Sequence, residues 1–338
     1  MLHVFASFEI KRYSSIPSPE GFLIEPFFFF HHSAQYLCEV FHFTTHLRAS
    51  ADDYALSVLI PTWNNLPYLQ NCLRSLRLHS RVKMQIIVAV NEGRDGTLEW
   101  MAEQNDVDWV HCEENAGVCY ALNACRSLVR APWMVYMNDD MYALPDWDIQ
   151  LFNAAERVGH HWVYLSATMI EPHASGNACV HVAHFGDSLA NFQEDQLLQA
   201  HLSLQLNDWM GSTWPPSMLH RDLWDLVGGM SPEFHPGMYS DPDLSMKLYR
   251  AGVRHFYGIG SSRVYHFGSK STGRAKKNPG RKRFLTKWGM SSRSFTKHLL
   301  QMGREGLHPL PAQAALPSTE RLANRWKHLW AILKREHY

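Results

Sequence analysis

The chain has 338 residues, of which 46% are hydrophobic and 12% aromatic, and its 32 basic side chains equal its 32 acidic ones in number. This composition excludes an intrinsically disordered chain, because such chains lack the apolar residues that a core needs. A formal net charge of zero also argues against a protein that coats nucleic acid.

Six cysteines are spread through the chain without any Cys-x-x-Cys pair. A disulfide scaffold needs a denser set and a structural zinc site needs paired cysteines, so we expect reduced thiols in a cytoplasmic protein. The first residues do not show a basic stretch followed by an apolar one, so we expect no secretory signal. The aromatic run Phe27–Phe30 is far shorter than the ~20 apolar residues that span a bilayer.

Short apolar runs alternate with segments of helical periodicity after residue 55. Runs such as LSVLIP and MQIIVAV are typical of strands buried on both faces. The alternation predicts an α/β fold with a mixed, mostly parallel sheet and helices on both faces. His160 and His161 follow a predicted helix end, which we expect them to cap. The predicted strands cover residues 56–61, 84–90, 108–111, 133–137 and 162–167, and the predicted helices begin near residues 67, 97, 117 and 146.

The chain divides into three parts by pattern. Residues 1–54 show no clear period, and we treat them as an N-terminal appendage. Residues 55–300 form one central domain. Residues 304–318 are rich in Pro and Ala, which is typical of a linker, so residues 301–338 are predicted to form a linker and a C-terminal amphipathic helix.

Two adjacent carboxylates, Asp139 and Asp140, directly follow the strand predicted over 133–137. Ligands of parallel sheets bind at the carboxyl ends of the strands. Like charges at this spacing repel each other unless a cation or a basic group lies between them, and Mg²⁺ and Mn²⁺ accept carboxylate ligands. The pair therefore indicates either a metal site or a solvated loop that caps a helix.

A third carboxylate and a histidine stand at similar positions later in the chain. Asp241 opens a helix predicted over 241–250, and His266 ends a short strand. Asp241 is either an N-cap or, facing a cleft, a base that takes a proton from a hydroxyl group. His266 alone is typical of a packed or hydrogen-bonded histidine, but with the three carboxylates it completes a coherent metal-and-base set.

Seven short motifs follow one another over residues 55–270. They are Pro61-Thr62-Trp63-Asn64, Asn91-Glu92-Gly93 with Asp95-Gly96-Thr97, Asn115-Ala116-Gly117 through Asn123, Asn138-Asp139-Asp140, Gly228-Gly229-Met230, Ser240-Asp241-Pro242-Asp243-Leu244 and Val264-Tyr265-His266. In this order they resemble the family 2 glycosyltransferases, although no single motif is specific. The resemblance implies a GT-A (Rossmann-like) fold and a nucleotide-sugar-dependent, mostly inverting enzyme whose catalytic domain is residues 55–300.

The resemblance also implies where the nucleotide-sugar donor binds. The indole of Trp63 offers a face for a base to stack on, and Glu92 matches the acid that reads the base edge. The family usually has Asp-Asp where this chain has Asn91 and Glu92, so the donor stays open between UDP-, GDP- and dTDP-linked sugars. The implied donor-binding residues are Pro61, Thr62, Trp63, Asn64, Glu92, Asn115, Gly117, Asn123 and Asp139.

The segment Asn138-Asp139-Asp140 matches the family's Asp-x-Asp triplet, which implies a divalent metal. Its first Asp is replaced by Asn138, so the binding of Mn²⁺ or Mg²⁺ rests on Asp140, with Asp139 on the ribose. His266 matches a position that supplies a further metal or diphosphate contact in many members.

A catalytic base is implied in the same way. Asp241 matches the aspartate of a Glu-Asp pair with that role, Ser240 replaces the glutamate, and Asp243 remains as an alternative base. The implied enzyme is a hexosyltransferase-type glycosyltransferase. It would transfer the sugar to a hydroxyl group of a glycan, a glycolipid or a protein by a single displacement with inversion.

Two other functions stay open at this point. A sugar-phosphate nucleotidyltransferase also binds nucleotides on a Rossmann-like sheet, but it normally has a Gly-rich loop with an Arg after the first strand, where this chain has Pro-Thr-Trp-Asn-Asn. A degenerate glycosyltransferase could serve as a glycan-binding or scaffolding module, because Asn91, Asn138 and Ser240 replace acids of the family.

Charge is distributed unevenly behind the neutral total. Residues 244–304 hold fifteen Lys or Arg and no Asp or Glu, whereas residues 1–243 carry a net charge of −17. The densest basic stretch, 270–283, follows His266 and contains glycines. It is either a solvated face or a flexible cationic lid over the diphosphate. It lacks a recognition module for nucleic acid, so we expect no nucleic-acid partner.

The predicted last helix, about residues 319–336, carries an apolar stripe with basic residues mostly off it. Such a stripe either packs against the domain core or lies in a membrane interface, with its tryptophans at headgroup depth. The second alternative predicts a lipid-linked acceptor and peripheral contact with the cytoplasmic face of a membrane. The stripe consists of Leu322, Trp326, Leu329, Trp330 and Leu333.

Overall fold

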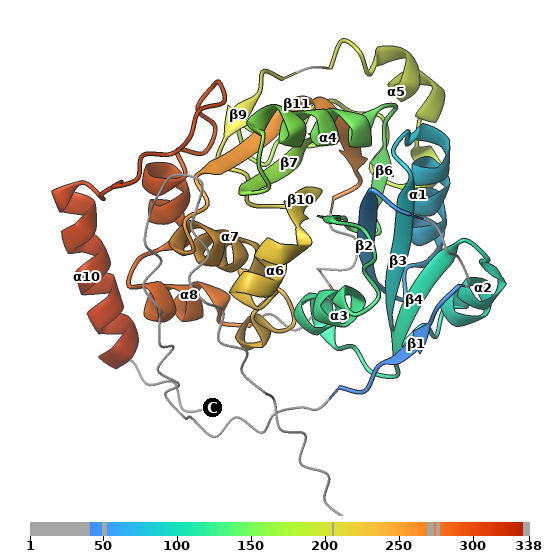
Figure 1. Cartoon of the computed structure of the whole chain (residues 1–338), viewed down its shortest axis with the longest axis horizontal. Coiled ribbons are helices and arrows are strands. Elements are labelled where there is room, and N and C mark those ends of the chain that lie inside the picture. Colours follow the sequence, from blue (N-terminus) through green and yellow to red (C-terminus); the bar gives the residue numbers. More distant parts are fainter. Residues whose placement is uncertain (1–40, 49–52, 205, 269–273, 275–277, 334–338) are drawn as a thin grey trace, which may run out of the picture. The chain divides into compact units, whose positions relative to one another are not determined.

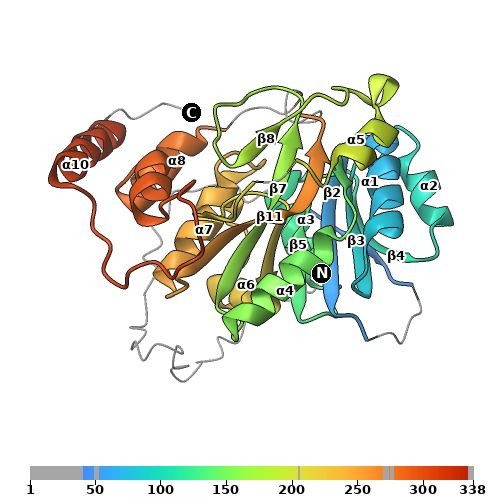
Figure 2. The same cartoon turned by 90° about the horizontal axis from the view of Figure 1, so that it is seen from above.

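A mixed sheet runs through the centre of the described part of the chain (Figure 1, Figure 2). The structure, a computed structural model, describes residues 41–48, 53–204, 206–268, 274 and 278–333. Most of the predicted appendage therefore lies outside the described residues. Its segment Thr44–His46 (β1) pairs antiparallel with Val107–Cys112 (β4), so this part of the appendage belongs to the sheet.

The longest strands of the sheet are parallel, and shorter antiparallel strands lie among them. The other strands are β2 (Leu56–Trp63), β3 (Met84–Asn91), β5 (Trp133–Tyr136), β6 (Met141–Ala143), β7 (Val163–Glu171), β8 (Val180–Val182), β9 (Trp209–Met210), β10 (Ser217–His220) and β11 (His255–His266). They are ordered β1-β4-β3-β2-β5-β10-β7-β11-β6, with β8 beside β7 and β9 beside β11. β2 to β5 form one parallel block, β7 and β11 form another, and β10 joins the two antiparallel to both. The predicted α/β fold class is confirmed.

Helices cover both faces of this sheet. Figure 1 shows α1 and α2 on one side of β2, β3 and β4, and α3 on the other. None of the helices that the structure describes is long and apolar enough to cross a membrane. The α-helices are α1 (Leu66–His79), α2 (Thr97–Glu103), α3 (Gly117–Arg126), α4 (Trp147–Val158), α5 (Glu194–Ala200), α6 (Arg221–Val227), α7 (Ser240–Arg250), α8 (Gly280–Trp288), α9 (Ser292–Ser294) and α10 (Ser318–Leu333). The other helical segments are the 3₁₀ helices η1 (Leu189–Asn191) and η2 (Pro232–Phe234) and the π-helix η4 (Phe295–Leu299).

The first helix shows how the sequence fixes an element beside the future site. Pro67 lies in the first turn of α1, where its missing amide hydrogen costs no helical hydrogen bond. Leu69, Leu73 and Leu76 lie on one face at helical spacing and are buried. α1 begins three residues after β2 ends, so its packing holds the turn that carries Asn64.

The last helix, α10, packs through its polar face. Asn324 is 1% exposed; its Oδ1 accepts a 2.8 Å hydrogen bond from the backbone N–H of Ser291, and its Nδ2 donates one of 2.9 Å to Ser294 Oγ. Packing of the apolar stripe against the core, one of the two sequence-based alternatives, is wrong, because these hydrogen bonds turn the stripe outward. The side chains Leu322, Trp326, Leu329, Trp330 and Leu333 are 47% to 67% exposed.

Candidate active site

A pocket of about 420 Å³ opens at the carboxyl ends of β2, β3 and β5. It is the place where a parallel sheet binds its ligands. Four of the predicted residues, Asn64, Glu92, Asn123 and Asp243, lie outside its lining. The predicted residues that line it are Pro61, Thr62, Trp63, Asn115, Gly117, Asp139, Asp140, Asp241 and His266.

Two carboxylates of the pocket, Asp139 and Asp140, are almost fully buried. Thr62 Oγ1 donates a hydrogen bond of 2.7 Å to Asp139 Oδ2. Burial raises the pKa of Asp139 and the charge of Asp140 raises it further, while the hydrogen bond from Thr62 acts in the opposite direction. Two like charges removed from water require a cation close by.

His266 lies between two carboxylates of the pocket. Its Nε2 is 3.4 Å from Asp140 Oδ1, and its Nδ1 is 2.7 Å from Glu171 Oε1. Burial opposes a charge on the imidazole, but these two partners outweigh it and raise the pKa of His266 to about 9. At neutral pH one imidazolium therefore balances only one of the two carboxylates that it contacts.

The donor set around His266 fits a divalent metal. Asp140 offers carboxylate oxygens, which Mg²⁺ and Mn²⁺ prefer, and His266 Nε2 becomes a metal ligand when an ion displaces its proton, while Glu171 accepts from Nδ1. All three side chains line the pocket. Asp139 is turned toward Thr62 and Glu171 contacts Nδ1, the ring nitrogen away from Asp140. Asp140 and His266 Nε2 are therefore the groups that would hold the ion, and Glu171 would orient the imidazole.

Asp241 lies in the first turn of α7 and lines the pocket. It is not the N-cap, one of its two predicted roles, because that position belongs to Tyr239. The φ of Tyr239 is +71°, in the left-handed region that residues other than glycine seldom adopt. Asp241 keeps part of its surface open, yet loss of surrounding water raises the pKa of its carboxyl to about 7. It can therefore exchange a proton near neutral pH.

Asp243, the alternative base, is fully buried away from the pocket lining. Its Oδ1 lies 2.9 Å from Lys287 Nζ and accepts a 2.8 Å hydrogen bond from Trp288 Nε1. Its Oδ2 accepts a 2.6 Å hydrogen bond from Ser231 Oγ. All of these bonds tie α7 to α8 and to the segment before η2. The geometry gives Asp243 a structural role and leaves Asp241 as the carboxylate that a substrate can reach.

Asn123 also has a structural position. Its Nδ2 donates a 2.8 Å hydrogen bond to the carbonyl oxygen of Met230, and its Oδ1 accepts one of 2.9 Å from the Met230 N–H. These two bonds hold the Gly228-Gly229-Met230 motif against α3. The resemblance placed Asn123 beside the ribose, whereas its polar atoms are occupied by the protein backbone.

Gly117 begins α3 at the wall of the pocket. Its φ is +62°, and a Cβ at this position would lie 2.5 Å from the carbonyl oxygen of Pro236. The same oxygen accepts a 2.7 Å hydrogen bond from the Val118 N–H. Only glycine permits this close approach of two backbone segments. Glycine is therefore required at position 117 by the packing of α3 against Pro236.

Arg274 contacts the pocket at Trp63. Its guanidinium lies 4.8 Å from the centre of the Trp63 ring and donates a 2.7 Å hydrogen bond to the Trp63 carbonyl oxygen. One face of the indole predicted to stack on a base is thus covered by a cation. Arg274 belongs to the basic stretch 270–283, of which residues 270–273 and 275–277 lie outside the described residues.

Asn91 lines the pocket, whereas the neighbouring Glu92 does not. Asn91 Nδ2 donates a 3.2 Å hydrogen bond to the carbonyl oxygen of Thr62, and its Oδ1 accepts one of 3.0 Å from the Ala116 N–H. A carboxylate could make only the second bond, so the asparagine suits this position. Glu92 Oε2 instead accepts a 2.9 Å hydrogen bond from Asn64 Nδ2.

Several residues of the pocket lie outside the motifs of the sequence, and Glu171 is the most informative of them. It ends β7, but the apolar pattern predicted this strand only as far as residue 167. The missed signal is the strand end itself, since all other acids of the site follow strands or open a helix. Trp214 and Tyr239 also line the pocket from loops that show no periodic pattern.

Residues 57–196 match the family model for glycosyl transferase family 2. Over these residues the resemblance is confirmed. The match supports a glycosyltransferase and includes the segments that place Thr62, Asp139 and Asp140 in the pocket. Asp241 and His266 lie beyond its end, so their roles rest on the geometry of the pocket.

Solved structures offer more distant similarities. S. aureus TarS 1-349 has a TM-score of 0.48 at 13% identity, over 82% of this chain and 71% of that one. The complex of the same protein with UDP-GlcNAc has a TM-score of 0.49 at 14% identity, over 82% and 72%. No curated protein matches this chain in sequence. Likeness at this level does not bear on the substrate of this chain.

The two aspartates of α7 predict opposite effects on stability. Asp243→Asn should lower the free energy of unfolding by about 3 kcal/mol, because it leaves Lys287 without its buried partner. Asp241→Asn should not lower it at pH 8. Folding raises the pKa of Asp241, so its charged form opposes folding above about pH 7, and any gain from the neutral amide should fade toward pH 4.

Urea denaturation of both variants and of the wild type at pH 8 and pH 4.5 measures these effects. Equal destabilisation by the two substitutions at pH 8 would contradict the separation of a structural Asp243 from an open Asp241.

Proposed function

We propose that this chain is an inverting, hexosyltransferase-type glycosyltransferase that moves a sugar from a nucleotide-sugar to a hydroxyl acceptor. The family match over residues 57–196 supports the class of reaction. The observation that carries the finer proposal is the shared pocket, in which Asp241 lies together with Asp140, Glu171 and His266. Sugar transfer needs positive charge beside the leaving diphosphate and a group that accepts the proton of the attacking hydroxyl.

The diphosphate of the donor is assigned to the end of the pocket that holds the buried carboxylates. Asp140 and His266, with Glu171 orienting the imidazole, would hold Mn²⁺ or Mg²⁺, which would supply positive charge for the leaving diphosphate. Arg274 adds a positive side chain at the rim, beside Trp63. The nucleoside then lies along the wall that Trp63, Asn91 and Gly117 form. Its nucleobase stacks on the indole of Trp63, either in place of the Arg274 guanidinium or together with it.

Asp241 is assigned as the base. A hydroxyl group is a weak nucleophile at neutral pH and must lose its proton as it attacks the anomeric carbon. The carboxyl of Asp241, with its pKa raised to about 7, is matched to this task better than an ordinary aspartate. Attack from the face opposite the diphosphate inverts the anomeric centre.

Asp241→Asn should reduce sugar transfer about 10³-fold and leave the dissociation constant of the donor nearly unchanged, because the amide keeps the shape but accepts no proton. The assay is hydrolysis of UDP-, GDP- and dTDP-sugars with Mn²⁺, which reports transfer to water, beside calorimetric binding of the same donors. A variant that loses binding but keeps its turnover per bound donor would contradict the role. Binding without any turnover in the wild type would favour the degenerate, glycan-binding alternative.

The same base predicts a pH profile. Asp241 must be ionised to accept a proton, so kcat/KM should rise about tenfold per pH unit below pH 7 and level off above it. Initial rates between pH 5.5 and pH 8 at saturating Mn²⁺ measure this limb. A flat profile over that range would remove Asp241 as the titrating base.

The acceptor proposal rests on α10 and the pocket beside it. A second pocket of about 450 Å³ shares Met238 and Tyr239 with the first and reaches Ala331 on α10. Arg281 and Lys282 also line it. An acceptor linked to an anionic lipid suits this surface, with its apolar chain toward α10 and its head group toward the two basic residues.

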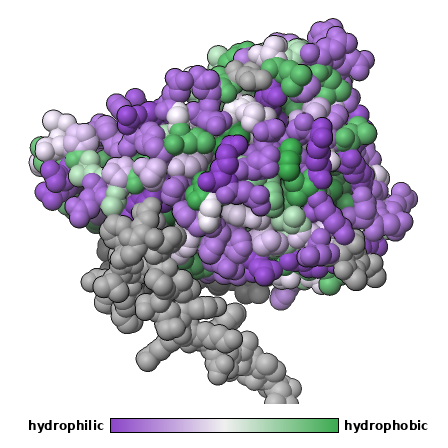
Figure 3. Space-filling view, turned by 45° about the horizontal axis from the view of Figure 1, so that its top comes forward, coloured by the Kyte–Doolittle hydropathy of each residue, from purple (hydrophilic) through white to green (hydrophobic). Residues whose placement is uncertain are grey.

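Peripheral binding to the cytoplasmic face of an anionic membrane follows from the same helix. The outward stripe of α10 carries two exposed tryptophans, and Arg321, Arg325 and Lys327 are exposed on the same helix. In Figure 3 green and pale patches lie among purple ones at the left end, where α10 lies in Figure 1. Apolar side chains flanked by basic ones are the pattern of an interfacial helix.

Replacing Trp326 and Trp330 together by Ser should weaken binding to vesicles of phosphatidylcholine and phosphatidylglycerol about tenfold or more, because two large apolar side chains no longer enter the interface. Co-sedimentation measures the bound fraction. Leu78→Ser, at a 61% exposed leucine of α1, is the matched control and should bind as the wild type does. Equal pelleting of all three proteins, or equal binding to vesicles without phosphatidylglycerol, would contradict the proposal.

A further inference from the structure

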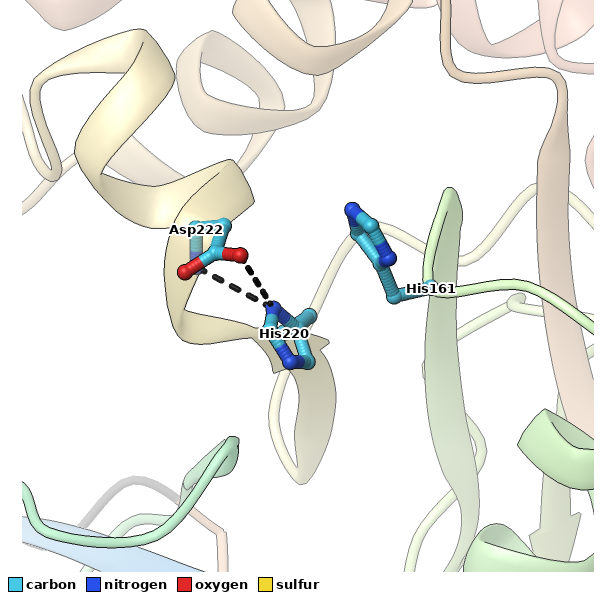
Figure 4. A group of neighbouring side chains, drawn as sticks. All are labelled: His161, His220 and Asp222. Atoms are coloured by element: carbon cyan, nitrogen blue, oxygen red, sulfur yellow. Dashed lines mark hydrogen bonds and ion pairs between the residues drawn. The ribbon is translucent and has the colours of Figure 1, made fainter. Parts of the chain in front are cut away.

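Three side chains of the types that bind metals, His161, His220 and Asp222, lie at the other end of the strands that lead to the pocket. β7 begins just after His161 and ends at Glu171 in the pocket. β10 begins just after Trp214 and Pro215 of the pocket and ends at His220. Figure 4 shows His161 beside β7, His220 at the end of β10 and Asp222 in the first turn of α6. The group is therefore separate from the proposed active site.

The spacing of the three side chains suits one ion. One nitrogen or oxygen atom from each lies within 4.8 Å of the others. His220 Nδ1 is 3.4 Å from Asp222 Oδ2, and the rings of His161 and His220 are 4.6 Å apart between centres. Two ligands at ~2.0–2.1 Å from a tetrahedral zinc ion are roughly 3.3 Å from each other. The pair His220 and Asp222 already has this separation, and the ligand atom of His161 lies within 4.8 Å of both.

The nitrogen of His220 nearest to Asp222 already has a partner. His220 Nδ1 accepts a hydrogen bond of 3.3 Å from the backbone N–H of Asp222. An imidazole nitrogen has one lone pair, so an ion on Nδ1 would replace this hydrogen bond, with Asp222 Oδ2, 3.4 Å away, as its second ligand. Arg221 is a neighbouring cation, but its Nε is 4.0 Å from the other oxygen, Oδ1.

The ring of His220 is held in place by a neighbouring side chain. Trp133 packs edge-on against the ring of His220 at 5.4 Å and holds its orientation.

We propose that His161, His220 and Asp222 bind one divalent transition-metal ion, for which Zn²⁺ is the probe. Two imidazoles and a carboxylate are ligands that zinc accepts, and the exposed side of Asp222 leaves a position for water. The ion joins the segment before β7 to the junction of β10 and α6. Because such an ion binds the folded chain, it stabilises that fold by mass action.

A second His-His-Asp group serves as the matched control. His173, His184 and Asp187 also bring their ligand atoms within 4.8 Å of one another. Both of these histidines are exposed, and His173 Nε2 is 3.8 Å from Asp187 Oδ2. Asp187 Oδ1 already accepts a hydrogen bond of 3.0 Å from Asn191. We therefore expect this group to be the weaker of the two.

The test is calorimetric titration of the full chain with ZnCl₂ at pH 7.5 in the Asp140→Asn background, which removes the main ligand of the pocket. One equivalent of Zn²⁺ should bind and should raise the melting temperature. His161→Ala and Asp222→Asn should each remove this equivalent, and both leave the backbone N–H that His220 caps. His184→Ala should change neither the stoichiometry nor the shift, and Mg²⁺ should not compete.

Failure to bind Zn²⁺, or binding that survives both His161→Ala and Asp222→Asn, would overturn the proposal. Loss of the equivalent in His184→Ala would assign the ion to the other group and would overturn it too. The readouts do not depend on sugar transfer, so a chain that binds zinc here without transferase activity would refute the proposed function alone.

Discussion

Burial of two adjacent carboxylates, Asp139 and Asp140, is the constraint on which the site depends. Removing like charges from water is unfavourable unless hydrogen bonds and a cation compensate. Thr62, at the end of β2, supplies a hydrogen bond to Asp139. His266, at the end of β11, supplies the cation beside Asp140. The ends of separate strands are thus brought together by a single electrostatic requirement, which a bound metal also satisfies.

α7 carries two aspartates, Asp241 and Asp243, whose surroundings differ. Asp243 is fully buried and satisfied by Lys287, Trp288 and Ser231, so its charge belongs to the fold. Asp241, two residues earlier, lines the pocket with a raised pKa. Environment, not residue type, decides which of them is available for chemistry.

Elements with a local pattern are predictable from the sequence. Apolar runs placed β2, β3 and β5, and strand ends located Asp139, Asp140 and His266. The fate of Asp243 could not be predicted, because its partners Lys287 and Trp288 lie more than forty residues later. The direction of the α10 stripe depended in the same way on bonds from Asn324 to Ser291 and Ser294. Such choices depend on tertiary contacts that no periodicity encodes.

The most direct test of the account is calorimetric binding of UDP, GDP and dTDP to the wild type and to Asp140→Asn, with and without Mn²⁺. If the buried carboxylates hold a metal that neutralises the diphosphate, one of these nucleotides should bind the wild type at least about tenfold more tightly with Mn²⁺, a difference of about 1.4 kcal/mol. The gain should disappear in Asp140→Asn. Equal affinity of the wild type with and without Mn²⁺ for every nucleotide that binds would contradict the account.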